Sequence, residues 1–247
     1  DVQVGHHLHS ETSQVQSIHL PTQNGHGISL VEMPSFDDSR EGVTDADILA
    51  MIATFLTTQY RDGTSQLTGF IYLHRISDTR VEGTSKRNLR MFQKLCGQDS
   101  LKNVAIVTTT WDKVTPEEGL QREQELMFSD NLFKPIMDGG AILMRHDGTQ
   151  QSAHDVIRHL FKLESIVPQI IRELVIEKRV LLDTEAGTEL QSEIRTVLQK
   201  QQKNLQELKD ETRKVEEDIA KLHGELEKLG NSTSTEYIRC AAGFVYF

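Results

Sequence analysis

The sequence contains only two cysteines among its 247 residues, Cys96 and Cys240. Two thiols this far apart in the chain do not predict a disulfide framework, which favours a reducing compartment and therefore a cytoplasmic protein. No run of about 18 apolar residues occurs, so no membrane span is expected. The N-terminus also lacks the basic-then-apolar order of a signal peptide. The net charge of −10 argues against nucleic acid or an anionic membrane as the main partner.

Apolar runs and amphipathic stretches alternate along the first two thirds of the chain. Residues 14–20 alternate in polarity and, with the apolar run Ile28–Val31, predict an antiparallel hairpin. Near-continuous apolar runs predict buried strands at 67–74, 103–109 and 141–144, and amphipathic patterns predict helices over 44–60, 85–95, 116–130 and 152–163. This alternation predicts a three-layer α/β domain with a mainly parallel sheet over residues 1–165.

Two of the predicted helices begin with recognisable caps. Thr44 is followed three residues later by Asp47, which is the spacing of a capping box. Thr115 is followed by Pro116 and two glutamates, so it supplies an N-cap, a proline at the first helical position and negative charge in the first turn. We therefore expect helices to begin at these two points.

The loop after Ile28–Val31 is rich in polar groups. Glu32 and Ser35 follow the strand directly, and Asp37 and Asp38 come next. In a nucleotide-binding sheet the loop after such a strand carries an acidic residue for Mg²⁺ and a small residue whose N–H faces a phosphate. Glu32 and Ser35 occupy these two places, so we expect a ligand site at this end of the sheet.

Residues 166–230 carry no further strand pattern and consist mainly of helix formers. A heptad repeat runs through this segment and predicts a coiled coil. The helix would pair with a second chain, fold back as a hairpin, or stand as a solvated single helix supported by Glu–Lys pairs. Residues 231–247 form an apolar C-terminal tail. The two seam positions are occupied by Ile194, Gln201, Leu208, Val215, Leu222 and Leu229, and by Leu198, Leu205, Thr212, Ile219 and Leu226.

The order of these motifs over residues 5–165 resembles the GTPase G domain of the septin-like and immunity-associated class, and most of all the G-domain proteins of mushroom-forming fungi. The resemblance implies GTP or GDP and Mg²⁺ as ligands. It implies that Thr12 ligates Mg²⁺, that Glu32 and Ser35 stand for the Asp-x-x-Gly motif, and that Thr12, Glu32 and Asp112 converge on one rim. Guanine would be read by Thr109, Thr110 and Asp112, and the base covered by Arg145 and His146.

Three departures from the family pattern concern the phosphates. Glu32 replaces an aspartate, Ser35 replaces a glycine, and no Gly-x-x-x-x-Gly-Lys-Ser/Thr loop occurs in the sequence. That loop supplies the N–H groups and the lysine that hold the β-phosphate. The family's first strand, phosphate loop and first helix are expected to precede residue 1. We therefore expect weak or no GTP affinity and GTPase activity, and an assembly role through the coiled coil.

Without the family's first strand, two apolar strands are expected to have an edge with no hydrogen-bonding partner. In the family that first strand lies between the strands predicted here at 28–31 and 67–74, and exposed strand edges promote association. We predict that Ile28–Val31 pairs directly with Phe70–Leu73, or that another chain fills the gap. A homo-oligomer is therefore expected through the coiled coil or through these open edges.

A second interpretation keeps hydrolytic chemistry. In it, His6, His7 and His9 join Glu32 and the aspartate pair in holding a divalent ion. Carboxylate and imidazole ligands suit Mg²⁺ or Mn²⁺, and a metal ion held there would activate water against a phosphoester, with nucleic acid as one substrate. The alternative for these residues is a solvated loop. In the metal interpretation Glu32, Asp37 and Asp38 join Thr12 or the three histidines as ligands.

Overall fold

The computed structural model describes residues 15–20, 27–36, 42–63, 67–79 and 83–243, without the side chains of residues 84, 193 and 230–243. The chain divides into two compact units, Asp1–Ser192 (unit 1) and Glu193–Phe247 (unit 2). Unit 1 therefore extends beyond the expected division at residue 165. Among the described residues, no helix combines the length and apolar character needed to cross a membrane.

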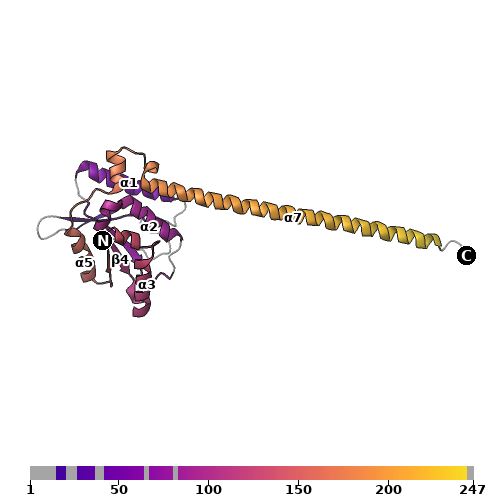
Figure 1. Cartoon of the computed structure of the whole chain (residues 1–247), viewed down its shortest axis with the longest axis horizontal. Coiled ribbons are helices and arrows are strands. Elements are labelled where there is room, and N and C mark those ends of the chain that lie inside the picture. Colours follow the sequence, from indigo (N-terminus) through magenta and orange to yellow (C-terminus); the bar gives the residue numbers. More distant parts are fainter. Residues whose placement is uncertain (1–14, 21–26, 37–41, 64–66, 80–82, 244–247) are drawn as a thin grey trace. The chain divides into compact units, whose positions relative to one another are not determined.

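The described elements follow one another mostly as alternating strands and helices (Figure 1). The strands are β1 (Gln16–Leu20), β2 (Ile28–Glu32), β3 (Phe70–Arg75), β4 (Val104–Thr109) and β5 (Ile142–Arg145). The α-helices are α1 (Asp45–Asp62), α2 (Gly83–Cys96), α3 (Pro116–Phe128), α4 (Lys134–Asp138), α5 (Gln150–Phe161), α6 (Gln169–Ile171) and α7 (Glu185–Gly243). Short 3₁₀ turns are η1 (Gln98–Asn103), η2 (Trp111–Lys113) and η4 (Leu181–Asp183), and η3 (Arg172–Ile176) is a π-helical turn.

The described strands form two separate sheets. The strands β3, β4 and β5 are parallel, with Tyr72 opposite Ile106 and Ala105 opposite Ile142. The predicted hairpin is confirmed, because β1 and β2 are antiparallel. The first predicted alternative, direct pairing of Ile28–Val31 with Phe70–Leu73, is wrong, because β2 and β3 lie in separate sheets. The second alternative, a strand from another chain, stays a prediction. Local apolar character identifies each strand, but it carries no information on which edges meet.

The central strand β4 has helices on both of its faces. Val104 and Ile106 face the main core formed with α1 and α2, whereas Ala105 and Val107 face α5. Successive side chains of a strand point to opposite faces, so a strand covered on both sides must be apolar throughout. This explains the uninterrupted apolar run and confirms a layered α/β arrangement around a parallel sheet.

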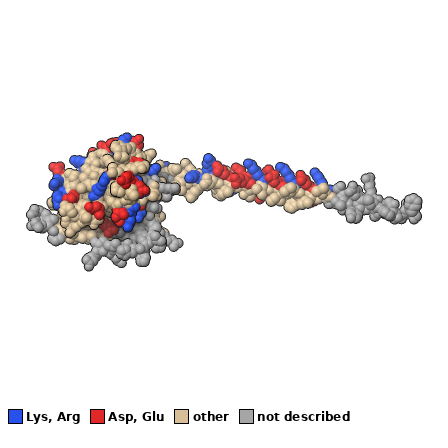
Figure 2. Space-filling view, turned by 90° about the horizontal axis from the view of Figure 1, so that it is seen from below, with Lys and Arg blue, Asp and Glu red and all other residues tan. Residues whose placement is uncertain are grey.

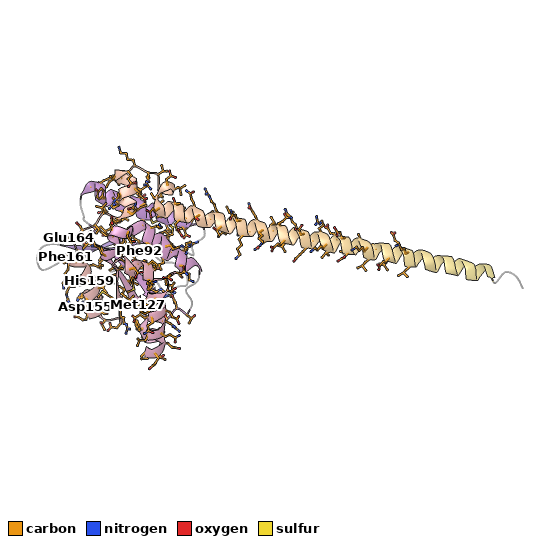
Figure 3. All side chains as sticks on the ribbon, viewed as in Figure 1. Phe92, Met127, Asp155, His159, Phe161 and Glu164 are labelled. Atoms are coloured by element: carbon orange, nitrogen blue, oxygen red, sulfur yellow. The ribbon has the colours of Figure 1, made fainter. Side chains whose placement is uncertain are left out.

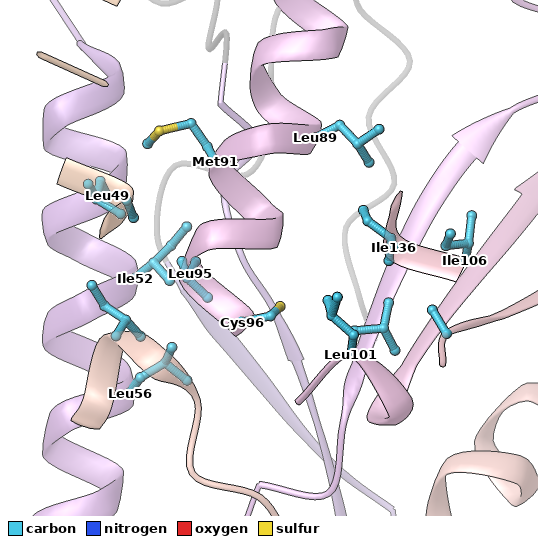
Figure 4. Close-up of a cluster of buried hydrophobic side chains, with 14 of the residues drawn as sticks. Leu49, Ile52, Leu56, Leu89, Met91, Leu95, Cys96, Leu101, Ile106 and Ile136 are labelled. Carbon is cyan, nitrogen blue, oxygen red and sulfur yellow. The ribbon is translucent and has the colours of Figure 1, made fainter. Parts of the chain in front are cut away.

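The main core lies between the sheet and helices α1 and α2. Leu49 and Ile52 of α1 and Leu95 of α2 are among its buried side chains (Figure 4). Cys96 is fully buried in the same cluster, and burial raises the pKa of its thiol well above the usual value. Three aromatic side chains pack together over β3. The ring of Phe92, which is labelled in Figure 3, lies 5.8 Å from that of Phe70 and 5.1 Å from that of Tyr72.

The predicted helix caps are confirmed. The Thr44 hydroxyl oxygen accepts from the N–H of Asp47, and Asp47 accepts from the N–H of Thr44 at 2.9 Å. Thr115 and Glu118 repeat this reciprocal arrangement at the start of α3. Gly63 ends α1 in a left-handed conformation with φ of 61°. Here short-range sequence signals determined the element boundaries, because the interactions that set them span only three residues.

The first turns of α7 belong to the core of unit 1. Ala186 and Leu190 are buried in the main cluster, and Thr184 caps the helix by accepting from the N–H of Gly187 at 3.0 Å. The carboxylate of Glu173, which is fully buried in the π-helical turn η3, accepts from the N–H of Glu185 at 3.1 and 3.2 Å. Arg179 donates to the same carboxylate at 3.1 Å. Glu173 therefore satisfies a helix-terminal N–H group that would otherwise lack an acceptor.

Within unit 2, α7 continues as an uninterrupted helix. The helical prediction for the extension is confirmed from Glu185 onward, whereas residues 166–184 contain only short helical turns and loops. The predicted alternative of a hairpin is wrong because α7 runs without a break to Gly243. The Leu and Ile residues of the predicted seam are about half exposed or more, as Ile194 (49%) and Leu229 (65%) illustrate.

Candidate functional site

Polar residues follow each strand of the parallel sheet at its C-terminal edge. His74 and Arg75 end β3, Thr110 and Asp112 follow β4, and His146 follows β5. Because the strands are parallel, their C-terminal ends lie along one edge, where α/β proteins bind ligands. The structure therefore brings together the residues predicted from the two loops after β4 and β5.

Arg145 is held between an aromatic ring and a carboxylate. Its guanidinium lies 4.3 Å from the centre of the Trp111 ring, and its Nε donates to Glu123 of α3 at 2.9 Å. A second donor, Nη2, also contacts this carboxylate. Glu123 is buried, and its hydrogen bond raises the pKa of Arg145. Two donors are thus engaged by Glu123, and one face of Trp111 is covered by Arg145.

Trp111 is part of the core edge. Its indole N–H donates to Thr108, with the backbone oxygen at 3.2 Å and the hydroxyl at 3.1 Å. The ring also packs against Gly119 of α3, where an added Cβ would lie 2.7 Å from a ring carbon. The tryptophan is therefore a packing residue between β4 and α3, and the glycine is needed for this close approach.

His146, Asp147 and Ser152 form a connected hydrogen-bond chain. The Ser152 hydroxyl donates to Asp147 Oδ1 at 2.7 Å, and His146 Nδ1 lies 2.7 Å from the same hydroxyl oxygen. Since the hydroxyl has one hydrogen and gives it to Asp147, Nδ1 of His146 is a donor to Ser152. In a Ser-His-Asp triad the histidine accepts the serine proton instead. This chain consequently orders the loop and does not activate Ser152 as a nucleophile.

Asp147 accepts several hydrogen bonds besides that of Ser152. The Thr149 hydroxyl donates to it at 2.6 Å and the Thr149 N–H at 2.9 Å. These hydrogen bonds from Thr149 and Ser152 hold the pKa of Asp147 well below its usual range. The loop after β5 therefore carries a fixed negative charge at the start of α5, whose N-cap is Thr149.

The predicted guanine-reading residues occupy the turn after β4. Thr109 ends the strand, and the Thr110 hydroxyl lies 3.0 Å from that of Ser77. Thr110 adopts a left-handed backbone with φ of 58°. Asp112 is exposed, and its carboxylate lies 3.1 Å from the Lys113 ammonium. A solvated aspartate paired with its own neighbour is not preorganised to receive two N–H groups of a base.

Two half-buried titratable side chains on β3 face the core below this edge. The His74 ring packs edge-on against Phe133 with a centroid distance of 5.4 Å, and burial lowers the pKa of His74. Burial also raises the pKa of Tyr72 to about 12. Both shifts favour the neutral form, so these two groups are core residues in the described part of the chain and not charged ligands.

Several predicted site residues lie outside the described residues. These are Thr12, Asp37, Asp38, His6, His7 and His9. Glu32 and Ser35 are described and exposed, at the end of β2 and just after it. Glu32 ends β2 of the two-stranded sheet, whereas Asp112 lies in η2 after β4 of the three-stranded sheet. The predicted rim of Thr12, Glu32 and Asp112 stays a prediction. Within the described ranges, no three His, Cys, Asp or Glu side chains gather closely enough to hold a metal ion.

Two shallow depressions, of about 300 and 370 Å³, lie away from the C-terminal edge of the sheet. Both are bordered by Lys94 of α2 and Glu185 of α7, which form an ion pair at 3.0 Å. Neither includes the residues after β4 or β5. At that edge Arg145, His146 and Asp112 each contact a neighbouring side chain, namely Glu123, Ser152 and Lys113.

No protein-family model matches the chain, and no curated protein sequence matches it. The function is therefore argued from the residues alone. The family resemblance pointed to Arg145, His146 and Asp112, but it did not point to Glu123 and Ser152, which bind Arg145 and His146. The only local sign was the Thr149–Ser152 spacing of an N-cap, and nothing in the sequence pairs Glu123 with Arg145 across 22 residues.

Proposed function

We propose that this protein is an assembly module that self-associates through α7, and that unit 1 is a G-domain-derived scaffold with weak or no GTP affinity. The observation that supports self-association is the mainly apolar seam of α7, whose large apolar side chains are exposed to water in the single chain. In Figure 2, charged side chains follow one side of this helix and uncharged side chains follow the other. The exposed seam residues of α7 include Leu198, Leu205, Leu208, Val215, Ile219, Leu222 and Leu226.

The free energies of the two kinds of contact favour pairing of α7 with another helix over a solvated single helix. The four ion pairs within this part of α7 are 3.5–4.0 Å long and join exposed side chains. Such pairs contribute about 0.2–0.5 kcal/mol each. Burying one leucine side chain contributes roughly 1.5–3 kcal/mol. A seam with this many large apolar residues therefore outweighs the ion pairs by several-fold, so association of seams is the larger source of stability.

Self-association is tested by placing charge on the seam. The double variant Leu208→Lys with Leu222→Lys puts two ammonium groups there, and Gln206→Lys with Ala220→Lys places the same charges at the same spacing beside it. Sedimentation equilibrium should give at least twice the chain mass of 28.0 kDa for wild type and the control. The seam variant should be monomeric, because a dimer would lose four leucines, or about 10⁴-fold in affinity.

Two results of this experiment would contradict the proposal. A monomeric wild type would remove the assembly role. A seam variant that stays associated would assign the contact elsewhere, for which the edges of β2 and β3 are the candidates. Ile71 and Leu73 of β3 are 38% and 67% exposed, and apolar strand edges join other strands readily.

The G-domain part of the proposal rests on the order of the elements. An antiparallel pair precedes three parallel strands, and the Thr110–Asp112 and Arg145–Asp147 segments follow adjacent strands. The site residues do not fit a bound nucleotide as they stand, since Arg145, His146 and Asp112 are engaged with neighbouring side chains. The phosphate-binding motif is absent from the sequence. No reaction step is therefore assigned to GTP or Mg²⁺.

Calorimetric titration of the whole chain with GTP and Mg²⁺ tests this part. We expect no binding in the micromolar range, because phosphate recognition depends on a loop that the sequence does not contain. ATP with Mg²⁺ is the matched control. Micromolar affinity for GTP that is lost in Asp112→Ala would overturn the expectation and restore a guanine-nucleotide site.

A metal-dependent hydrolase remains the second interpretation, with Mg²⁺ or Mn²⁺ as the metal. No described residue favours it over the assembly role, and the histidines and the aspartate pair on which it depends lie outside the described residues.

A further inference from the structure

We infer that α7 pairs with α7 of a second copy in parallel and in register, as a two-stranded coiled coil. This inference rests on the self-association proposed above. The seam occupies two positions of each heptad, which is the narrow stripe typical of two-stranded coiled coils. Position a is filled by Leu198, Leu205, Thr212, Ile219 and Leu226, and position d by Ile194, Gln201, Leu208, Val215, Leu222 and Leu229.

The four ion pairs of this segment leave the seam free. They join Lys203 to Glu207, Arg213 to Asp210 and Glu217, and Lys221 to Asp218. None of these residues occupies position a or d, so pairing along the seam would keep every one of these contacts. The occupant that matches the length, spacing and apolar character of the stripe is the same stripe on another copy.

Two polar residues, Thr212 and Gln201, interrupt the seam, and they differ in the hydrogen-bond partners that they need from a second helix. The Thr212 hydroxyl donates to the backbone oxygen of Leu208 within its own helix at 2.9 Å. It is thereby satisfied in either orientation of a partner helix. The Gln201 carboxamide, by contrast, carries donors and an acceptor at a d position and needs complementary groups across the interface.

The two orientations treat Gln201 differently. In a parallel, in-register pair, Gln201 faces Gln201 of the second copy, and each amide donates to the other's oxygen. Two antiparallel registers overlap the seams equally, and each sets Gln201 against an apolar residue, Leu226 in one and Ile219 in the other. The register with Leu226 sets Leu205 against Leu222 and pairs more leucines with one another, so it is the antiparallel alternative. Both registers leave two carboxamides without partners, and an unpaired buried amide is costly. A polar seam residue selects register in the same way in other coiled coils.

Charges beside the seam do not reverse this preference. The parallel pair places Glu211 near Glu216 of the second copy, which is unfavourable. The antiparallel pair places Lys209 near Glu216, which is favourable, but also Glu211 near Asp218, which is not. Exposed contacts of this kind are individually weak and partly cancel. The free-energy cost of burying two unpaired Gln201 carboxamides is larger than these charge effects. The parallel arrangement is therefore preferred despite the contact between Glu211 and Glu216.

The glutamate contact supplies a test with opposite outcomes. In the parallel pair Glu216→Lys converts two repulsions with Glu211 into attractions, and dimer affinity should rise about tenfold. In the antiparallel pair the same substitution repels Lys209, and affinity should fall by a similar factor. Glu217→Lys makes the same charge change away from the seam and should alter affinity by less than about threefold. Dissociation constants from sedimentation equilibrium give each value.

Cysteine cross-linking provides an independent measurement in the full chain. With Cys240→Ser present, Leu222→Cys should form a disulfide-linked dimer under mild oxidation, because the two thiols meet across a d layer. In the antiparallel register they would lie on the order of 25 Å apart along the axis. Glu217→Cys, which points away from the seam, is the control and should stay unlinked. Cys96 does not interfere because it is buried.

The outcomes separate this inference from the proposed function. A tighter dimer for Glu216→Lys together with cross-linked Leu222→Cys supports the parallel pair. A dimer that weakens or is unchanged on Glu216→Lys, or that leaves Leu222→Cys unlinked, overturns the parallel register while self-association stands. A monomeric wild type overturns both.

Discussion

Replacing Phe133 with alanine should lower the free energy of unfolding of unit 1 by about 3–5 kcal/mol. Phe133 is 2% exposed and belongs to the main core. Its ring packs edge-on against those of Tyr72 and His74, at centroid distances of 6.1 and 5.4 Å. Removal of the ring leaves a cavity beside two side chains of β3. The lost stability is the sum of the hydrophobic burial that is lost and the cost of that cavity.

Phe128→Ala is the matched control for this experiment. Phe128 is 72% exposed at the end of α3, so the same change of side chain should shift stability by less than about 0.5 kcal/mol. Urea unfolding followed by circular dichroism, with a probe in unit 1, gives both values. Equal losses for the two variants would show that Phe133 is not a core residue.

Glu173→Ala should destabilise the start of α7 and unit 1 by about 2–4 kcal/mol. The substitution removes the acceptor of the Glu185 N–H and a carboxylate at a helix N-terminus. Arg179 is partly exposed and can be solvated when its partner is lost, which keeps the loss below that of a fully buried ion pair.

Two further variants isolate the cause. Glu173→Gln retains an acceptor but no charge and should lose roughly 1–2 kcal/mol. Arg179→Ala leaves the carboxylate on the helix N–H group and should cost less than Glu173→Ala. Urea unfolding provides the measurement. If Arg179→Ala were as damaging as Glu173→Ala, the ion pair and not the helix terminus would be the stabilising contact.

Short-range signals in the sequence predicted most elements of unit 1. Thr44 with Asp47 and Thr115 with Pro116 located two helices, because a cap is made by residues only three positions apart. The apolar run of β4 located a buried strand, because both of its faces are covered. The five-residue helix α4 was missed, since it follows no period long enough to recognise.

Contacts between residues far apart in the sequence could not be predicted from these short-range signals. The sequence placed Arg145 and His146 at the C-terminal end of a predicted strand, where they lie in the structure. It did not show that Glu123 and Ser152 bind them, because these contacts depend on how α3 and α5 pack. Strand pairing also depends on contacts between distant parts of the chain: a topological argument predicted that Ile28–Val31 pairs directly with Phe70–Leu73, but β2 and β3 lie in separate sheets. The π-helical turn that places Glu173 under α7 has no local signature.

The reactivity of the buried Cys96 thiol can be used to measure how often the core opens. Modifying reagents attack the thiolate, and a fully buried thiol with a raised pKa is both protonated and out of reach. Once Cys240 is changed to serine, the rate at which a reagent labels the remaining cysteine therefore follows the opening of the core between α1 and α2. Pulsed alkylation would thus time this motion without a dye or an engineered label.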